Sequence, residues 1–524
     1  MRILLITIYI LISCSANLFP QWSNDPNNNL IVGYGLNPEL CSDSAGGCYI
    51  TYEVGYPSKL YLHRVDKYGY QPWGDKRIIA GELDEQSNAK IIEDGEGGVI
   101  VSFGDRIMFD SYRLRIQLVD SNGSFLWGDA GTRVSIVDTV QGSQRIVTDG
   151  DGGCVIVWIE SDASEYRINR IDRNGQRVWS DSGLYIQSDY NSTPPRLIRA
   201  SDGSYYVQIR YNLYRISKNG DIVLQDSTTL TNIVPDSEGG VVQSGRVWTG
   251  MIPKLVAQRK DSLGNNLWQE PYVEIADSLH INTLLNIQHS NDYCYYGWVG
   301  KKNGLNNRVQ FQALRKDGSL LFSNGSVLLS SDSAISKMGI IPSHFSKVIF
   351  CWNIPGITNS TFSQMYDTLG NKLWNENGVI VAHPNILYQS FTTDGDGGFI
   401  IGGIINEFTV VAQQVNRYGK LGEIITLINP GNNYSIPSEA ILYQNFPNPF
   451  NSSTVIKYSI PSESYITIEL YNVIGELIKT IVDGYHNEGI YTVTLSSNDF
   501  PSGIYLYKMK TETQSLTKKL IIIK

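Results

Sequence analysis

Asp120-Ser121-Asn122-Gly123-Ser124-Phe125-Leu126-Trp127 decides the fold of this chain, because a glycine followed four residues later by tryptophan recurs along the sequence. The other copies are Gly69/Trp73, Gly175/Trp179, Gly264/Trp268 and Gly370/Trp374, with Leu224 after Gly220 and Phe322 after Gly318 in the same position. The series ends at Gly419, and its glycines recur about every 50 residues. Such a period indicates one supersecondary unit repeated about eight times.

Each unit contains two turn signals and no helical periodicity. The first is an aspartate followed by a Gly-Gly pair, as in Asp94-Gly95-Glu96-Gly97-Gly98, and the second is Asp-x-x-Gly, as in Asp120 to Gly123. Aspartate caps such turns with its side chain, and glycine supplies positive φ. Apolar or alternating runs between the turns indicate four strands in two hairpins. We therefore predict an all-β fold, an eight-bladed β-propeller over residues 22–428, with seven blades as the alternative because the fourth to seventh units are less regular.

The ends of the repeat region indicate how the ring closes. Glu423 stands where the eighth unit should have its tryptophan, whereas Trp22 and the apolar run Leu30-Ile31-Val32 precede the first complete unit. We expect the N-terminal segment to supply the outer strand of the last blade, which removes an open sheet edge. The periodic tryptophans are predicted to pack between blades. Trp248 falls outside the pattern and is the better candidate for a ligand-binding aromatic residue.

Two sets of polar residues allow a structural and a functional interpretation. One polar residue stands six positions before the second glycine of each unit, namely His63, Gln117, Asn169, Tyr214, Gln258, Gln312, Gln364 and Gln413. We expect these side chains to bond the backbone of the next blade, with a channel lining as the alternative. Asp149-Gly150-Asp151 and Asp394-Gly395-Asp396 have the spacing of calcium ligands, but capped turns are the favoured interpretation.

The N-terminus predicts export. Residues 1–16 contain one positive charge, a short apolar run and small residues, as in a secretory signal peptide. Lipidation of Cys14 is the alternative to cleavage after Ala16. Export permits disulfides, and Cys41 and Cys48 flank one tight turn, so a bridge between them remains open beside the interpretation as buried thiols.

Composition argues against several classes of function. The net charge is -9 and the pI about 5.3, without basic clusters, so we expect no nucleic-acid partner. The sequence has no paired Cys-x-x-Cys, no Gly-x-Ser-x-Gly and no His-Glu-x-x-His. We therefore assign no catalytic, cofactor or metal residues, and the binding residues remain unknown.

A different pattern begins after the polar, proline-bearing linker 429–438. Residues 439–524 contain about seven short strands, which predict a small Ig-like β-sandwich. The box Asn445-Phe446-Pro447-Asn448-Pro449-Phe450-Asn451, the turn Tyr471-Asn472-Val473-Ile474-Gly475, Ser502-Gly503-Ile504-Tyr505 and the run Lys518-Lys519-Leu520 occur together. On these motifs the module resembles the type A C-terminal sorting domain of the type IX secretion system of Bacteroidetes, although Ser452 stands where many members have proline.

That resemblance implies partners and a location. It implies recognition by the type IX secretion machinery, export across the outer membrane, and removal of the domain near the linker. Release, or attachment to lipopolysaccharide on the outer face of the outer membrane, would follow. The repeats also resemble propeller-like passengers of this group. We expect a monomeric, non-enzymatic binding or structural scaffold with a carbohydrate or protein ligand; the alternative is a polysaccharide-active hydrolase or lyase with its site in the central funnel.

Overall fold

The computed structural model describes residues 22–422 and 440–523, apart from the short segments 75–76, 80–84, 109–110, 161–164, 187–192, 251, 269–270, 278–285, 290–292, 303–304, 323–326, 331–337, 344–345, 355–358, 446–447, 451–452, 462–463, 487–488, 498–499 and 512–513. The signal peptide with Cys14, Glu423 and the linker 429–438 lie outside the described residues. The chain divides into two compact units, Met1–Ile424 and Ile425–Lys524. The described segments are strands and loops, and they include no helix that could cross a membrane.

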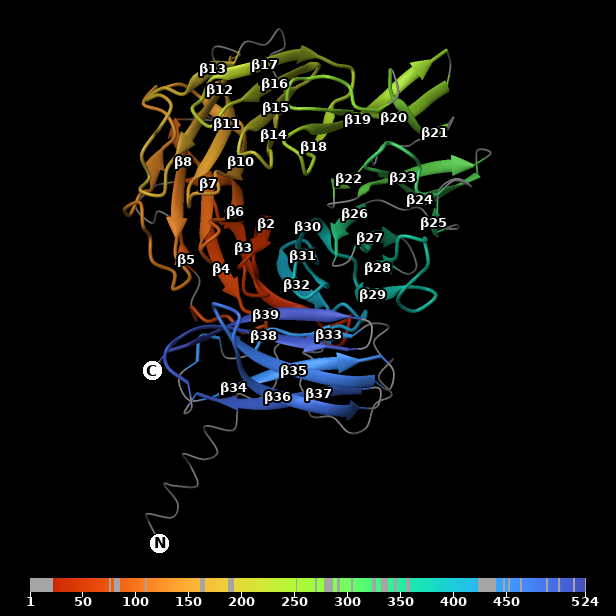
Figure 1. Ribbon diagram of the computed structural model, residues 1–524. Helices are drawn as coiled ribbons and strands as arrows, with labels where there is room; N and C mark the ends of the chain where they lie inside the picture. The colour runs from red at the N-terminus through yellow and green to blue at the C-terminus, as the bar shows by residue number, and fades with distance from the viewer. Residues whose placement is uncertain are drawn as a thin grey trace. The chain divides into compact units, whose positions relative to one another are not determined.

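The described strands of the first unit form eight four-stranded antiparallel sheets (Figure 1). The first to fourth sheets comprise β2 (Leu36–Ser42), β3 (Cys48–Val54), β4 (Lys59–Val65) and β5 (Arg77–Ile78); β6 (Gln86–Glu93), β7 (Val99–Met108), β8 (Ser111–Val119) and β9 (Thr132–Arg133); β10 (Gln141–Thr148), β11 (Cys154–Glu160), β12 (Glu165–Ile171) and β13 (Leu184–Ile186); and β14 (Arg196–Arg199), β15 (Tyr205–Ile209), β16 (Asn212–Ile216) and β17 (Ile222–Ser227).

The fifth to eighth sheets repeat this order, except that the eighth takes a strand from the N-terminus. They comprise β18 (Asn232–Pro235), β19 (Val241–Thr249), β20 (Ile252–Lys260) and β21 (Val273–Asp277); β22 (Asn286–His289), β23 (Tyr293–Lys302), β24 (Leu305–Arg315) and β25 (Val327–Ser330); β26 (Met338–Pro342), β27 (Val348–Ile354), β28 (Ser360–Tyr366) and β29 (Val379–Ala382); and β30 (Leu387–Thr393), β31 (Phe399–Ile405), β32 (Thr409–Val415) and β1 (Leu30–Tyr34). The all-β prediction is confirmed.

Successive sheets contact each other through their first strands. Each of β2, β6, β10, β14, β18, β22 and β26 contacts the first strand of the following sheet, and β30 contacts β2. Figure 1 shows these strands following one another around a common centre, from red to cyan. The contacts therefore return from the eighth sheet to the first.

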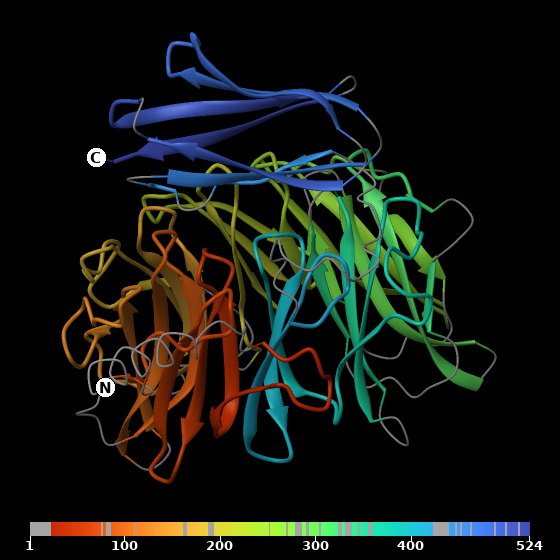
Figure 2. The same cartoon turned by 90° about the horizontal axis from the view of Figure 1, so that it is seen from below.

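The N-terminal segment completes the eighth sheet, as the sequence predicts. Strand β1 pairs antiparallel with β32, so that Leu30 lies opposite Ala412 and Tyr34 opposite Thr409. Figure 2 shows the red N-terminal segment beside the cyan strands of this sheet. Trp22 precedes β1, has only 3% of its surface exposed, and packs in a core that contains residues of both β2–β3 and β31–β32.

Six tryptophans of the repeat pattern are each bonded to the following repeat. The indole N–H of Trp127 donates to the backbone carbonyl of Arg173 at 3.0 Å, inside the next Asp-x-x-Gly turn. A Cβ at Gly175 in that turn would lie 2.8 Å from Cγ of Trp127, so the turn requires glycine for close approach as well as for its φ of +76°. Equivalent indole bonds join Trp22 to Lys67, Trp73 to Ser121, Trp179 to Lys218, Trp268 to Lys316 and Trp374 to Arg417. Packing between repeats is confirmed for these six tryptophans.

The glutamine row has a different partner from the one predicted. The amide of Gln364 accepts from the backbone N–H of Trp374 at 3.0 Å and donates to the carbonyl of Asn375 at 2.7 Å, and both partners belong to the same repeat. For the glutamines of the row the prediction of a bond to the next blade was wrong, because the side chain leaves its strand beside the outer segment of its own sheet. In the eighth repeat the partner is Ser23, which the N-terminal segment supplies, since Gln413 donates to its carbonyl at 2.8 Å.

Cys41 and Cys48 do not form the disulfide that the sequence left open. Both are free thiols, as are Cys154, Cys294 and Cys351. In the β2–β3 register, Cys41 lies opposite Tyr49 and Cys48 lies opposite Ser42. Because the two cysteines belong to neighbouring pairs, their side chains point to opposite faces of the sheet. They pack in two separate cores.

The second unit consists of two sheets that share one core. The first sheet has the order β33 (Ile441–Leu442), β34 (Ser453–Ile460), β37 (Gly489–Ser496), and the second has the order β36 (Leu477–His486), β35 (Ser464–Asn472), β38 (Gly503–Lys510), β39 (Ser515–Ile522). Alternate apolar side chains from both sheets are buried together, including Ile456, Tyr458, Ile468, Tyr507 and Leu520. This alternation places the polar residues of the strands on the outer faces.

Candidate binding site

Four of the first strands carry a β-bulge at the same position. In β2, β6, β10 and β30 two residues of the first strand stand opposite one residue of the second strand, and regular pairing continues afterwards. The bulged residues with left-handed backbone are Asn37, Asn88, Ser143 and Tyr388, with φ of 52°, 54°, 53° and 50°. Each stands six residues before the aspartate of its Gly-Gly turn. Bulges redirect side chains out of the regular alternation and are frequent beside functional sites.

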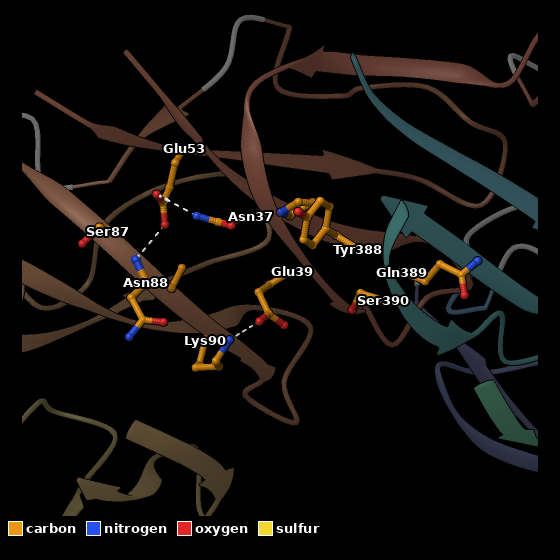
Figure 3. A pocket seen from close by; sticks show the side chains of 11 residues that line it. Asn37, Glu39, Glu53, Ser87, Asn88, Lys90, Tyr388, Gln389 and Ser390 are labelled. Carbon is orange, nitrogen blue, oxygen red and sulfur yellow. Dashed lines mark hydrogen bonds and ion pairs between the residues drawn. The ribbon is translucent and has the colours of Figure 1, made fainter. Parts of the chain in front are cut away.

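Three of these bulges surround a pocket with a volume of about 450 Å³. Its walls come from the bulge of β2 (Asn37, Pro38, Glu39), the bulge of β6 (Ser87 to Lys90), the bulge of β30 (Tyr388, Gln389, Ser390), and Glu53 at the end of β3 (Figure 3). This volume lies within the range of about 300–1,000 Å³ that is typical of small-molecule sites. The pocket is therefore large enough for a ligand, and its lining is predominantly polar.

Hydrogen bonds fix the first and eighth sheets at this pocket. The backbone N–H of Leu40 in β2 donates to the Ser390 hydroxyl at 3.1 Å, and that hydroxyl lies 3.4 Å from the Leu40 carbonyl oxygen. The side chain of Gln389 donates to the carbonyl of Ile386 at 3.0 Å. The contact between the eighth and the first sheet therefore holds the walls of the pocket.

The ionic side chains of the pocket are paired with groups of the pocket itself. The Glu53 carboxylate accepts from the backbone N–H of Asn88 at 2.7 Å and from the side-chain amide of Asn37 at 3.1 Å. Lys90 forms an ion pair with Glu39 (Figure 3). Neither histidine nor arginine occurs among the described residues of the lining. Two carboxylates converge here, but each has its own internal partner.

Tyr388 differs from the residues at equivalent positions. Asparagine and serine occupy the other three bulges, and asparagine tolerates left-handed backbone well, whereas a bulky residue with positive φ is an outlier. The side chain of Tyr388 is nevertheless 58% exposed and lies at the pocket wall opposite Asn88 and Glu53 (Figure 3). This is the one aromatic side chain among the residues that line the pocket.

The two candidate calcium turns bond to protein groups instead. One oxygen of Asp149 accepts from the backbone N–H groups of Asp151 and Gly153, both at 2.8 Å, and the other accepts from Arg170 at 2.8 Å. Arg170 also bonds Asp151 at 2.8 Å, so a guanidinium occupies the place between the two carboxylates. No cluster of three potential metal-ligating residues occurs in the described parts of the chain.

At the second turn, the side-chain amide of Gln414 bonds Asp394, whereas the guanidinium of Arg170 bonds Asp149 at the first turn. Asp394 caps its turn through the N–H groups of Asp396 and Gly398, and its other oxygen accepts from Gln414 at 3.3 Å. Burial raises the pKa of Asp394, and the hydrogen bonds oppose that shift only in part. Capping by aspartate, the favoured prediction for these turns, is confirmed at both positions.

Trp248, the aromatic residue singled out in the sequence, lies apart from the pocket. It belongs to β19 near its hairpin with β20, is 67% exposed, and does not line the pocket. The residues that do line it were missed. A signal was present, because asparagine stands six residues before the turn aspartate in both of the first two repeats.

In the second unit, the Asn-Phe-Pro-Asn-Pro-Phe box is bonded to the last strand. The side chain of Asn448 accepts from the N–H of Ile521 at 2.8 Å, and Phe450 exchanges backbone bonds with Ile521 and Ile523 at 3.1 and 2.9 Å. Asn445, which is buried, donates to Thr454 at 2.9 Å through its side chain. Phe446, Pro447, Asn451 and Ser452 lie outside the described residues.

These motif residues coincide with a known family. The family model described as the secretion system C-terminal sorting domain matches residues 444–523. The C-terminal module is a type IX sorting domain. The sorting domain directs secretion of the protein and its attachment to the bacterial cell surface, as the resemblance implied. It also implies an interaction with the type IX secretion machinery.

The comparisons name no activity for the first unit. No curated protein matches the chain. Among solved structures, the β-propeller domain of the Trilobed protease from Pyrococcus furiosus is 8% identical, with a TM-score of 0.40, covering 75% of this chain and 98% of that one. A polysaccharide lyase, the PL25 ulvan lyase bound to -[GlcA(1-4)Rha3S]-, is 9% identical, with a TM-score of 0.39 and coverages of 76% and 97%. A protein of unknown function from Bacteroides caccae is 16% identical, with a TM-score of 0.27 and coverages of 46% and 82%.

Proposed function

We propose that the first unit is an eight-bladed β-propeller, closed by β1, which acts outside the cell as a non-enzymatic binding scaffold. The cyclic contacts of the first strands and the pairing of β1 with β32 support the ring. The sorting domain, a small Ig-like sandwich in this proposal, is removed near the linker after it has engaged the secretion machinery. The passenger is then released or attached to surface lipopolysaccharide as a monomer.

The pairing of the ionic groups in the pocket carries the non-enzymatic interpretation. A general base needs a carboxylate or imidazole that is placed to take a proton from the substrate. Glu53 is held by Asn37 and Asn88, and Glu39 is held by Lys90. Displacing either carboxylate would break these bonds, and an ordinary hydrogen bond contributes about 0.5–1.5 kcal/mol. The arrangement therefore suits recognition by fixed polar groups.

The test is an activity screen of the purified full chain. We expect no release of reducing ends or of unsaturated uronate from neutral and anionic polysaccharides. Turnover that Glu39→Gln or Glu53→Gln abolishes would establish the hydrolase or lyase alternative in this pocket. Turnover that survives both substitutions would overturn the non-enzymatic proposal and place catalysis elsewhere.

A further inference from the structure

We propose that the pocket between the bulges of β30, β2 and β6 binds a neutral sugar unit, with the ring of Tyr388 as its stacking surface. This inference rests on the binding function proposed above and adds the class of ligand. It follows from the backbone of Tyr388, the chemistry of the walls, and the pairing of their charges.

The backbone of Tyr388 is the first argument. Tyr388 has a φ of +50°, a left-handed conformation that is unfavourable for a residue with a large side chain. Asparagine at the equivalent positions of β2 and β6 shows that the bulge itself can be built at lower cost. The side chain of Tyr388 is 58% exposed, so much of its surface faces solvent. Strain kept at a solvent-facing aromatic residue is the pattern expected of a ligand contact.

The walls around the ring match a polyhydroxylated molecule. One face of a sugar ring presents C–H groups that pack on an aromatic face, and its edge presents hydroxyls that both donate and accept. Opposite Tyr388 stand the carboxylate of Glu53 and the amides of Asn37 and Asn88, with Ser87 beside them (Figure 3). A peptide ligand would need apolar recesses for its side chains, and the nonpolar groups of the lining are limited to the Tyr388 ring, Pro38 and Ala89.

The charges indicate a neutral sugar. Among the described residues that line the pocket, Lys90 is the single cationic one, and it already pairs with Glu39. An acidic or sulfated sugar would approach two carboxylates without a cation to receive it, and like charges brought together in a pocket oppose binding. A neutral sugar meets the same carboxylates as hydrogen-bond acceptors, and charge-assisted hydrogen bonds are the stronger kind.

The experiment measures binding and stability in the same variants. The full chain is applied to an array of neutral and anionic oligosaccharides, and the strongest neutral binder is titrated by calorimetry. Tyr388→Asn should weaken binding about tenfold or more, because it removes the ring. The same variant should melt at the wild-type temperature or about 1–3 °C above it, because asparagine relieves the backbone strain. Tyr388→Phe should keep the affinity within about threefold.

Trp248→Ala is the matched control, since it removes an equally exposed aromatic residue outside the pocket and should leave the affinity unchanged. Unchanged binding by Tyr388→Asn, or recognition of anionic sugars alone, would overturn the inference. If no sugar on the array were bound, the sugar-binding inference would also be overturned. The scaffold proposal would stand in that case unless the activity screen detects turnover. A loss of binding in Tyr388→Asn accompanied by a lower melting temperature would contradict the strain argument.

Discussion

The closure of the repeat region can be tested at Trp22. Its side chain is buried, and its indole N–H donates to the Lys67 carbonyl at 3.0 Å. Trp22→Ala removes both the buried ring and this bond, and truncation of a buried tryptophan costs about 3–5 kcal/mol. Trp22→Phe keeps a ring but loses the bond, so we expect a cost of about 1 kcal/mol from the bond, with any packing loss added.

The assay is guanidinium unfolding of the full chain, followed by tryptophan fluorescence and limited proteolysis. Proteolysis separates the transition of the first unit from that of the sorting domain, because a chain of two units need not unfold in one step. Trp248→Ala is the control and should change the free energy of unfolding by less than about 0.5 kcal/mol, since the residue is exposed. If Trp22→Ala cost less than about 1 kcal/mol, the first unit would not depend on its N-terminal segment, and the closure would be refuted.

Three further predictions concern the turns, the thiols and the sorting domain. Asp149→Asn should lower the free energy of unfolding by about 1–3 kcal/mol, because it removes the buried one of the two carboxylates that Arg170 bonds, whereas Asp394→Asn should be neutral or stabilising in chemical denaturation. Because burial raises the folded-state pKa of Asp394, the wild type loses stability as the pH rises from the unfolded-state pKa through the folded-state value, and Asp394→Asn should remove this slope. Burial also raises the pKa of Cys41 and Cys48, so both should resist iodoacetamide in the native protein and react in denaturant without reductant; a linked peptide pair would disprove the free-thiol state. Deletion of residues 439–524 should trap the protein in the periplasm, and normal secretion of the truncated chain would contradict the sorting role.

Much of the fold could be predicted from the sequence because its turns are fixed by local chemistry. Aspartate and glycine recur where a capped turn with positive φ is needed, as at Asp120 and Gly123, so the strands between them follow. The role of Trp22 could also be predicted, because the last unit lacks its tryptophan and the N-terminal segment has one that precedes the first complete unit. The hydrogen-bond partner of the glutamine row could not be predicted, since a position within a strand does not say which neighbouring backbone the side chain reaches.

The candidate site could not be predicted for a related reason. A bulge changes the face on which the next side chains lie, and no residue type marks it strictly. Asn37 and Asn88 hinted at left-handed backbone, whereas Tyr388 contradicted that preference and so gave no signal. In the structure, the left-handed backbone of this exposed tyrosine is the main support for the proposed binding role of Tyr388.

The bonds between the box at Asn448 and Phe450 and strand β39 link two segments about 70 residues apart in the chain. A chain interrupted before Ser515 contains the whole box but lacks the strand that holds it in place. We therefore expect the box to take up its folded position only after β39 has been synthesised, so that a chain interrupted earlier lacks a folded sorting signal.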